Sequence, residues 1–481
     1  MQTIFWHDYE TFGADTRKDR PCQFAGVRTD LDLNIISDPI TLYCKPNDDF
    51  LPSPDACLIT GITPQHAYQE GVKEVEFAQR INTIFSVPET CVAGYNSIRF
   101  DDEISRNLFY RNFIDPYERE WKNGNSRWDI IDLVRLTYAL RPDGINWPKD
   151  ENDQPSFRLE RLTEANNIAH EAAHDAMSDV YATIAVAKLI KEKQPQLYDY
   201  VFKHRTKSSI APFFEKLDMK PLFHVSSKFP ASYGCCALVL PLFQHPVNAN
   251  GYVVFDLRQN PEDLFLLSRD EIKSRLYSKS VDLLAQNKFR PALKTVHINK
   301  CPMISPASVI KSISDERLKV WDLNINDLTK HLEWVRSNPE FIEKLKEIFS
   351  EEVDFPAESD PDLMVYSGFL GAIDKKLVSE VRISSEIELA EKEFNFIDPR
   401  LPELLFRYKA RNFPGALTDE EQDMWEKYRA SKMLDNNSKY LTFSKYYERI
   451  NELASDENIS SKSLNILEEL KYYGESIIPY N

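Results

Sequence analysis

The sequence predicts an α/β domain that is followed by a smaller β-rich domain and then by an all-α region. Residues 1–195 alternate short apolar runs with segments of helical periodicity, residues 196–349 contain β-type runs separated by turn signals, and residues 350–481 are helical and acidic. A chain of 481 residues is long enough for two to four domains with cores of their own. We therefore expect three domains with these boundaries.

The first domain is expected to begin with a strand, because the apolar run Ile4-Phe5-Trp6 leads directly into the motif His7-Asp8-Tyr9-Glu10-Thr11-Phe12-Gly13. Further strands are predicted at residues 24–29, 40–44 and 91–95, and a short, turn-rich connection at 57–64. Helical spacing predicts helices over residues 74–85, from 101 onward, over 129–140 and over 175–192, with an end at Gln194-Pro195. The buried side of the last helix is expected to carry Met177, Val180, Tyr181, Ile184 and Ala187.

The second domain is predicted to be a small barrel. Its expected strands lie at residues 222–226, 236–240 and 252–255, and Asn250-Gly251 is a hairpin turn signal before the last of them. Helices are expected near residues 270–283 and 327–335. The third domain is predicted to be helical, with helices over residues 401–409, 419–432 and 461–473.

The composition indicates an ordinary globular protein, with 42% hydrophobic and 28% charged residues. No apolar run reaches the roughly 18 residues that a membrane span needs, and the N-terminus has no basic and apolar signal pattern. The seven cysteines include no C-x-x-C pair, which argues against a disulfide framework or a zinc site. These features predict a cytoplasmic protein with reduced cysteines and no membrane partner.

The distribution of charge along the chain indicates what kind of partner the protein binds. The net charge of -17 argues against a nucleic acid, but residues 201–300 contain 15 Lys and Arg against 8 Asp and Glu, a net of +7 that leaves -24 for the rest. A basic middle on an acidic chain suits a polyanion. Chance unevenness along a long chain is the alternative.

Asp8 and Glu10 are the first candidate site residues. Side chains two positions apart on a strand point to the same face, so these carboxylates project together and would repel each other. A divalent cation removes that conflict, and oxygen ligands suit Mg²⁺ or Mn²⁺. Two solvated acids at an exposed strand edge are the alternative reading of so short a motif.

Two later segments supply further candidates. Asp101 follows a buried strand, where sites in α/β sheets gather, although it could also be only a helix cap. His174 and Asp179 are five residues apart and cannot share a helical face, so His174 is expected in the turn before the helix and Asp179 one turn inside it. A histidine with a pKa near 6.5 is a natural general base.

Together, these residues predict a phosphodiesterase. Four acids, Asp8, Glu10, Asp101 and Asp179, can hold two Mg²⁺ ions about 4 Å apart, one that activates a water and one that steadies the leaving oxygen. His174 would take the proton of the water. In-line attack on the phosphodiester would then release a nucleoside monophosphate.

The same five positions match the pattern of the DEDD exonucleases of the histidine subclass, which is D-x-E, then Asp, then H-x-x-x-x-D. The chain most resembles the bacterial exonuclease I family, on motifs spread over nearly its whole length: HDYETFG, GYNSIRFDDE, NSRWDI, LRPDGINWP, PSFRLE, HDAMSDVYATIA, VHINKCP and YKARNFPG. The resemblance implies a ribonuclease H-like exonuclease domain (1–195), an SH3-like β-barrel domain (196–349) and an all-α C-terminal domain (350–481).

The resemblance also implies an activity and partners. These are Mg²⁺-dependent 3′→5′ hydrolysis of single-stranded DNA to 5′-deoxynucleoside monophosphates, a role in DNA repair and recombination, and binding to the C-terminal tail of single-stranded DNA-binding protein. Two added domains around the nuclease core could close over one strand, so we also expect processive digestion, and we expect a monomer. Arg158 matches a family position that contacts the DNA end.

Other substrate contacts are expected from basic and aromatic residues, since arginine and lysine track phosphates while bases stack on aromatic rings at roughly 1–3 kcal/mol each. The candidates for substrate binding are Glu10, Arg106, Tyr117, Trp121, Arg135, Phe157 and Arg158. Core packing is the alternative for Tyr117 and Phe157. Candidate backbone contacts in the middle domain are Lys203, Arg205, Lys207, Lys288, Arg290, Lys294 and Lys300. Arg141 and Tyr200 are the candidates for the partner's acidic tail.

Two other functions compete with this prediction. A 3′→5′ RNA exonuclease of the same fold is one, but stand-alone RNA trimmers of that kind are usually a single short domain. A non-catalytic DNA-binding scaffold is the other, and it would not need all five catalytic side chains, which are present here.

Overall fold

The computed structural model describes residues 2–170, 175–351 and 358–480. The chain forms two compact units. Unit 1 comprises Met1–Ser126, His170–Tyr181 and Pro356–Asn481, and unit 2 comprises Arg127–Ala169 and Ala182–Phe355.

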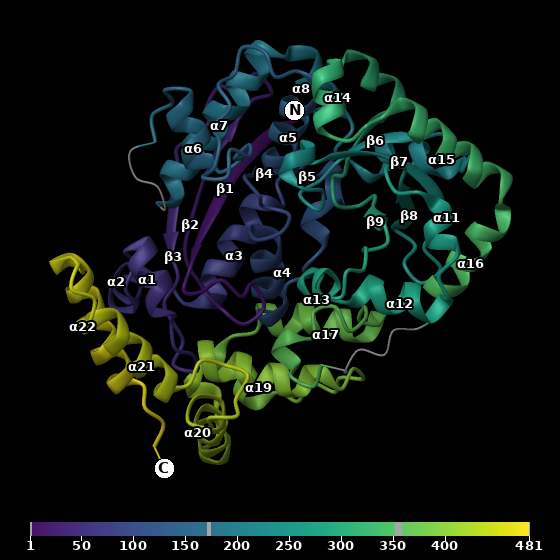
Figure 1. The fold of residues 1–481 in the computed structure, drawn as a ribbon. Helices are drawn as coiled ribbons and strands as arrows, with labels where there is room; N and C mark the ends of the chain where they lie inside the picture. Colours follow the sequence, from purple (N-terminus) through teal and green to yellow (C-terminus); the bar gives the residue numbers. More distant parts are fainter. Residues whose placement is uncertain (1, 171–174, 352–357, 481) are drawn as a thin grey trace. The chain divides into compact units, whose positions relative to one another are not determined.

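Unit 1 contains a mixed sheet with the strand order β3-β2-β1-β4, built from β1 (Thr3–Thr11), β2 (Pro21–Thr29), β3 (Ile40–Tyr43) and β4 (Thr90–Gly94). β1 runs antiparallel to β2 and parallel to β4, and β2 runs antiparallel to β3 (Figure 1). The predicted strands are confirmed. β1 is therefore central, which places the Asp8 and Glu10 motif in the interior of the sheet rather than at an exposed edge.

Helices flank this sheet within unit 1. They include α3 (Glu74–Phe85), α4 (Asp101–Arg111) and the start of α7 (Ala176–Lys193), all as predicted. The prediction of a turn-rich connection at 57–64 is wrong, because α1 (Pro54–Thr60) ends within this segment and α2 (Pro64–Glu70) begins at its last residue. Each follows a Ser or Thr cap and starts with proline, which preorganises the first helical turn.

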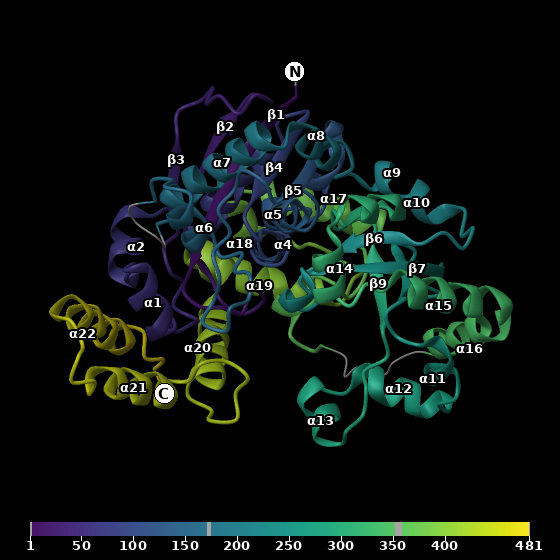
Figure 2. The same cartoon turned by 45° about the horizontal axis from the view of Figure 1, so that its top comes forward.

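The C-terminal helices of unit 1 pack on its N-terminal part. These helices are α17 (Ala372–Ile383), α18 (Glu386–Glu391), α19 (Arg400–Asn412), α20 (Asp419–Met433), α21 (Phe443–Ala454) and α22 (Ser461–Ser476). The three predicted helices are confirmed as α19, α20 and α22. Both views of the fold show α21 and α22 side by side near α1 (Figures 1 and 2), where buried Phe12, Cys57 and Leu467 share one apolar core.

Unit 2 contains a second sheet, which is antiparallel and has the order β10-β6-β7-β8-β9. Its strands are β6 (Leu222–Val225), β7 (Cys236–Gln244), β8 (Gly251–Asp256), β9 (Leu293–His297) and β10 (Met303–Pro306). The first three strands and the reversal at Asn250-Gly251 are confirmed. β9 and β10 were not predicted, because their short sequences show little apolar alternation.

Helices make up most of the rest of unit 2. They are α5 (Ile130–Leu140), α6 (Leu159–Ala165), α8 (Pro195–Lys203), α9 (Lys207–Ile210), α10 (Pro212–Glu215), α11 (Pro261–Phe265), α12 (Arg269–Tyr277), α13 (Ser280–Ala285), α14 (Asp315–Val320), α15 (Ile325–Ser337) and α16 (Pro339–Ser350). α5 and α15 confirm predictions. The helix expected at 270–283 is instead two helices, since Ser278 and Lys279 have extended backbones.

Two smaller expectations concern burial. Tyr181 was expected on the buried side of α7, but it is 40% exposed and the prediction is wrong. All seven cysteines are buried and carry free thiols. Of the helices in the described ranges, none has the length and apolar character required to span a bilayer.

Candidate active site

Three carboxylates converge at the end of β1. Asp8 and Glu10 project from the same face of this strand, as their spacing requires, and Asp179 lies in the first turn of α7. One oxygen from each of the three side chains lies within 4.8 Å of the other two. All three residues belong to unit 1, so this cluster is defined within a single compact body.

Asp101 completes the acidic group. It is the first residue of α4 and is buried, and its Oδ1 accepts a hydrogen bond of 3.1 Å from the backbone N–H of Tyr9. That bond fixes Asp101 against β1 between Asp8 and Glu10. The structure therefore brings together the four acids that the sequence predicts as metal ligands.

The electrostatics of the cluster call for a cation. Burial, followed by the negative charges of Asp101, Glu10 and Asp179, raises the pKa of Asp8 well above its usual value. Burial, followed by Asp179 and Asp101, raises the pKa of Glu10 to about 8. Closely packed carboxylates that raise one another's pKa are the arrangement that a hard divalent cation neutralises. The donor set consequently fits Mg²⁺ or Mn²⁺.

The histidine part of the motif is only partly described. His174, the predicted general base, lies outside the described residues. His170, which the sequence analysis did not select, is within hydrogen-bonding distance of Asp179 through its Nε2. Asp175 also adds negative charge near Asp8 and Glu10, and it accepts a bond of 3.0 Å from the N–H of Ser178 at the start of α7. No spacing rule links His170 to Asp179, because the contact depends on the path of the chain before α7.

In unit 1, Arg106 and Tyr117 form part of a polar and aromatic cluster. Arg106 is 4% exposed and makes bonds of 2.8 and 3.1 Å to the two carboxylate oxygens of Glu120. The Tyr117 ring lies 5.6 Å from the Arg106 guanidinium and 6.5 Å from the ring of Tyr366. The charge of Arg106 is thus already compensated by protein acids. Trp121, by contrast, is 65% exposed and presents its ring to solvent.

In unit 2, the predicted substrate residues differ in exposure. Arg158 is exposed just before α6. Phe157 is buried against Tyr138, with ring centroids 5.4 Å apart, and lies under Arg135, whose guanidinium is bonded to Asp132 at 2.6 Å. These contacts give Phe157 a packing role. Arg158 and Trp121 keep the exposure that a substrate contact requires.

The predicted partner and backbone contacts also lie in unit 2. Exposed Arg141 donates to Ser312 Oγ at 2.7 Å, and half-buried Tyr200 donates to the carbonyl of Ile304 at 2.9 Å. Among the basic candidates, the structure exposes Lys203, Lys207, Lys288, Arg290 and Lys300, and it buries Arg205 against Phe202 and half-buries Lys294 beside His224.

Models of three protein families match the chain. The family described as "Exonuclease" matches residues 5–187, the "Exonuclease I SH3-like domain" matches residues 205–351, and the "Exonuclease I C-terminal domain" matches residues 359–477. The sheet of unit 2 accordingly belongs to an SH3-like domain. The sheet of unit 1 belongs to a ribonuclease H-like exonuclease domain.

Individual proteins resemble the chain over almost its full length. Exodeoxyribonuclease I of Haemophilus influenzae is 46% identical over 477 residues, which are 99% of each chain. A solved structure of Escherichia coli exonuclease I in complex with a dA16 oligonucleotide has 42% identity and a TM-score of 0.93, and covers 99% of this chain and 100% of that one. The zinc ion bound form of an Escherichia coli exonuclease I complex with single-stranded DNA has 43% identity, a TM-score of 0.93 and the same coverage.

Proposed function

The chain belongs to the exonuclease I family, and from this premise we propose that it removes nucleotides processively from the 3′ end of single-stranded DNA. The products would be 5′-deoxynucleoside monophosphates. The observation that carries the proposal is the cluster of Asp8, Glu10 and Asp179, whose oxygens lie within 4.8 Å of one another.

The four acids are the proposed metal ligands. Two divalent ions, Mg²⁺ or Mn²⁺, held by Asp8, Glu10, Asp101 and Asp179 would supply an activated water and charge stabilisation for the leaving oxygen. Asp101 is held in place by its bond to Tyr9 N. Zinc in the related Escherichia coli complex supports a metal site in this family without identifying the ion that this chain uses.

His174 is the proposed general base. It lies two positions before Ala176, the first residue of α7, and Asp179, in the first turn of that helix, is in the acidic cluster. An imidazole with an ordinary pKa near 6.5 can accept a proton from a water at neutral pH. We assign the proton transfer to His174 and a supporting contact with Asp179 to His170.

Single-stranded DNA is the proposed substrate. Related exonuclease I structures are complexes with DNA oligonucleotides or single-stranded DNA. We propose that Arg158 contacts the DNA end and Trp121 stacks on a base, with contributions from Glu10 and Tyr117. Arg106, Arg135 and Phe157 remain proposed contacts, although their present partners are other protein side chains.

The proposal extends to partners and domains. We propose a monomer that acts in DNA repair and recombination and binds the tail of single-stranded DNA-binding protein through Arg141 and Tyr200. The family matches at 5–187, 205–351 and 359–477 support domain boundaries at 1–195, 196–349 and 350–481.

Digestion of oligonucleotides labelled at one end or the other tests the function. We expect Mg²⁺-dependent release of mononucleotides from the 3′ end of single-stranded DNA, slow digestion of duplex, and loss of activity in Asp8→Ala. Matched RNA and DNA oligomers distinguish an RNA exonuclease, since only RNA offers a 2′-OH. Cleavage from the 5′ end, or full activity in Asp8→Ala, would contradict the proposal.

A further inference from the structure

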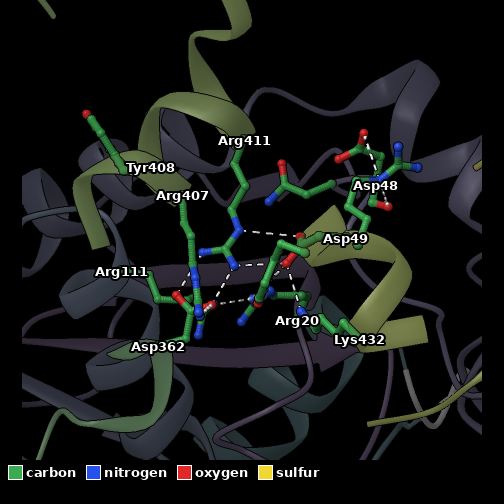
Figure 3. A network of polar contacts seen from close by, with 12 residues as sticks. Arg20, Asp48, Asp49, Arg111, Asp362, Arg407, Tyr408, Arg411 and Lys432 are labelled. Atoms are coloured by element: carbon green, nitrogen blue, oxygen red, sulfur yellow. Dashed lines mark hydrogen bonds and ion pairs between the residues drawn. The ribbon is translucent and has the colours of Figure 1, made fainter. Parts of the chain in front are cut away.

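A buried array of charged side chains lies beside the end of β1, apart from the carboxylate cluster. We call it the Arg20 array. Its members are Arg20, Asp49, Glu74, Asp362, Arg411 and Lys432, and none of these side chains is more than 4% exposed. Figure 3 shows Arg20, Asp49, Asp362, Arg411 and Lys432 converging from separate segments. All six residues belong to unit 1.

Arg411 of α19 is the central cation of the array. Its guanidinium makes a bond of 2.8 Å to Asp49 Oδ2 and one of 2.9 Å to Asp362 Oδ1, and Lys432 Nζ lies 2.7 Å from Asp49 Oδ2. Burial alone would raise the pKa of Asp362, but the adjacent Arg411 holds it well below its usual value. Both aspartates therefore stay charged inside the protein, and removing the charge of either leaves buried cations without compensation.

Arg20 joins the array to the strand that carries the acids. Its guanidinium lies 3.8–4.0 Å from Asp49, Glu74 and Asp362. Its backbone carbonyl accepts a bond of 2.9 Å from the N–H of Phe12, two residues beyond Glu10. The array thereby fixes the backbone at the end of β1 from the side of β2.

The same end of β1 is held from two more directions. Ser53 N, four residues after Asp49, donates to the carbonyl of Phe12 at 2.7 Å. Arg17 lies in the connection between β1 and β2. Its guanidinium donates a hydrogen bond of 2.7 Å to the carbonyl of Leu363, the residue after Asp362. The backbone that follows each of two array acids is thus bonded to the segment that follows Glu10.

The register of the sheet shifts where this segment starts. β1 pairs with β2 residue by residue up to Glu10, and the register then skips Cys22 of β2 between Glu10 and Thr11, a shift of the bulge type. Bulges of this kind re-aim the neighbouring side chain. The direction of the Glu10 carboxylate therefore depends on how the chain beyond it is held.

We propose that the Arg20 array positions Glu10, so that Asp362 and Arg411 from the C-terminal helical part of unit 1 set the metal affinity of the carboxylate cluster. This inference rests on the proposed function, because it assumes that the cluster binds a divalent cation. Asp362 and Arg411 are positioning residues here, since neither is within the acidic cluster itself.

The substitution Asp362→Asn tests the inference, because it removes a charge and keeps the size of the side chain. We expect the Ca²⁺ affinity, measured by isothermal titration calorimetry, to fall roughly tenfold or more, the effect typical of residues that support metal ligands. The Mg²⁺ concentration for half-maximal digestion should rise by a similar factor. Asp398→Asn is the matched control. Asp398 pairs with Arg400 at 2.6 Å in the same C-terminal part and is not a member of the array, so its substitution should leave both values unchanged.

Arg17→Ala is a second variant in case Asp362→Asn does not fold. The Arg17 side chain is 44% exposed, and its loss removes the bond to Leu363 without leaving a buried charge. We expect a smaller shift of metal affinity in the same direction. Wild-type Ca²⁺ affinity in Arg17→Ala and in any folded Asp362→Asn would overturn the inference, even if the melting temperature fell. Wild-type protein that binds no Ca²⁺ and digests no DNA would overturn the proposed function, and the inference with it.

Discussion

Asp8 and Glu10 form a cluster of three carboxylates only because the fold brings Asp179 from α7 beside them. Two acids on one strand face could both be hydrated, whereas three acids packed this closely, with Glu10 buried among them, repel one another. Burial and mutual repulsion raise the pKa of Asp8 and Glu10. The cost of that repulsion predicts that the stability of the protein depends on pH and increases when a divalent cation is added.

The pKa of Glu10 predicts a pH-dependent stability. Because this pKa rises from 4.5 to about 8, the folded state binds more protons than the unfolded state in that interval, and the free energy of unfolding falls as pH increases. Thermal unfolding of the metal-free protein should show this decrease. Mg²⁺ should raise the melting temperature more near pH 8 than near pH 4.5, because it binds the deprotonated acids. Glu10→Gln should flatten the decrease, and a metal-free protein equally stable across the interval would contradict the assignment.

The contact between His170 and Asp179 predicts that His170 affects the Mg²⁺ requirement of the enzyme. Hydrogen-bond partners of metal-ligating carboxylates orient them, and losing such a partner typically weakens metal affinity about 10–100-fold. We expect His170→Ala to increase the Mg²⁺ concentration needed for digestion by that range. His331→Ala, which removes a bond to a carbonyl in unit 2, is the control. An unchanged Mg²⁺ requirement in His170→Ala would show that the contact does not orient Asp179.

At the scale of the element, the start of α4 joins the acidic cluster to the core. Asp101 opens the helix, and the next residue, Asp102, forms a buried ion pair of 2.5 Å with Arg119. The Arg119 guanidinium also lies 4.8 Å from the ring of Phe85 at the end of α3. The first turn of α4 is therefore linked to two neighbouring segments through Arg119. These contacts help to fix the position of Asp101.

Removing Arg119 should destabilise the protein strongly. The buried ion pair between Arg119 and Asp102 would be lost, and breaking such a pair by removing one partner costs about 3–5 kcal/mol. Chemical denaturation of Arg119→Met measures the change. Arg80→Met is the matched control, because Arg80 pairs with Glu76 on the surface, with 50% and 46% exposed side chains, and such pairs contribute roughly 0–1 kcal/mol. Similar losses in the two variants would contradict the role of the buried pair.

At the scale of the whole molecule, charge is distributed unevenly along the chain. The total is -17, but residues 201–300 carry a net of +7, with Lys203, Lys207, Lys288 and Arg290 exposed. A polyanion is attracted by local charge more than by the total, because salt screens distant charges over about 8–10 Å. The acidic total therefore does not prevent DNA binding at a basic region of the sequence.

This distribution predicts how salt affects DNA binding. Each cation that neutralises a single-strand phosphate contributes about 0.7 to the slope of log affinity against log salt concentration. We expect Lys203→Ala with Lys207→Ala to lower that slope by roughly 0.7 for each phosphate that is no longer neutralised, measured by fluorescence anisotropy with Ca²⁺ in place of Mg²⁺. Replacing Lys462 and Lys471 of α22 in unit 1 is the control. Equal slopes in the wild type and the Lys203 and Lys207 variant would show that these lysines do not bind DNA.

The sequence by itself determined several local elements and the choice of the four acids. Helical spacing predicted α3 to its observed ends, and period two placed Asp8 and Glu10 on one face, because both patterns follow from the geometry of a single backbone segment. The caps that start α1 and α2 are also local signals, but the prediction for residues 57–64 was only a turn-rich segment.

Only the tertiary structure decided which charged side chains are paired and which aromatic rings are packed in the core. Tyr181 is exposed, Phe157 packs on Tyr138, and Arg106 pairs with Glu120, although each sequence pattern also allowed the opposite. The Arg20 array shows the same dependence, because Arg20 gains its acidic neighbours from segments far away in the chain. Burial and charge neutralisation are properties of long-range contacts, and no local spacing specifies the partner.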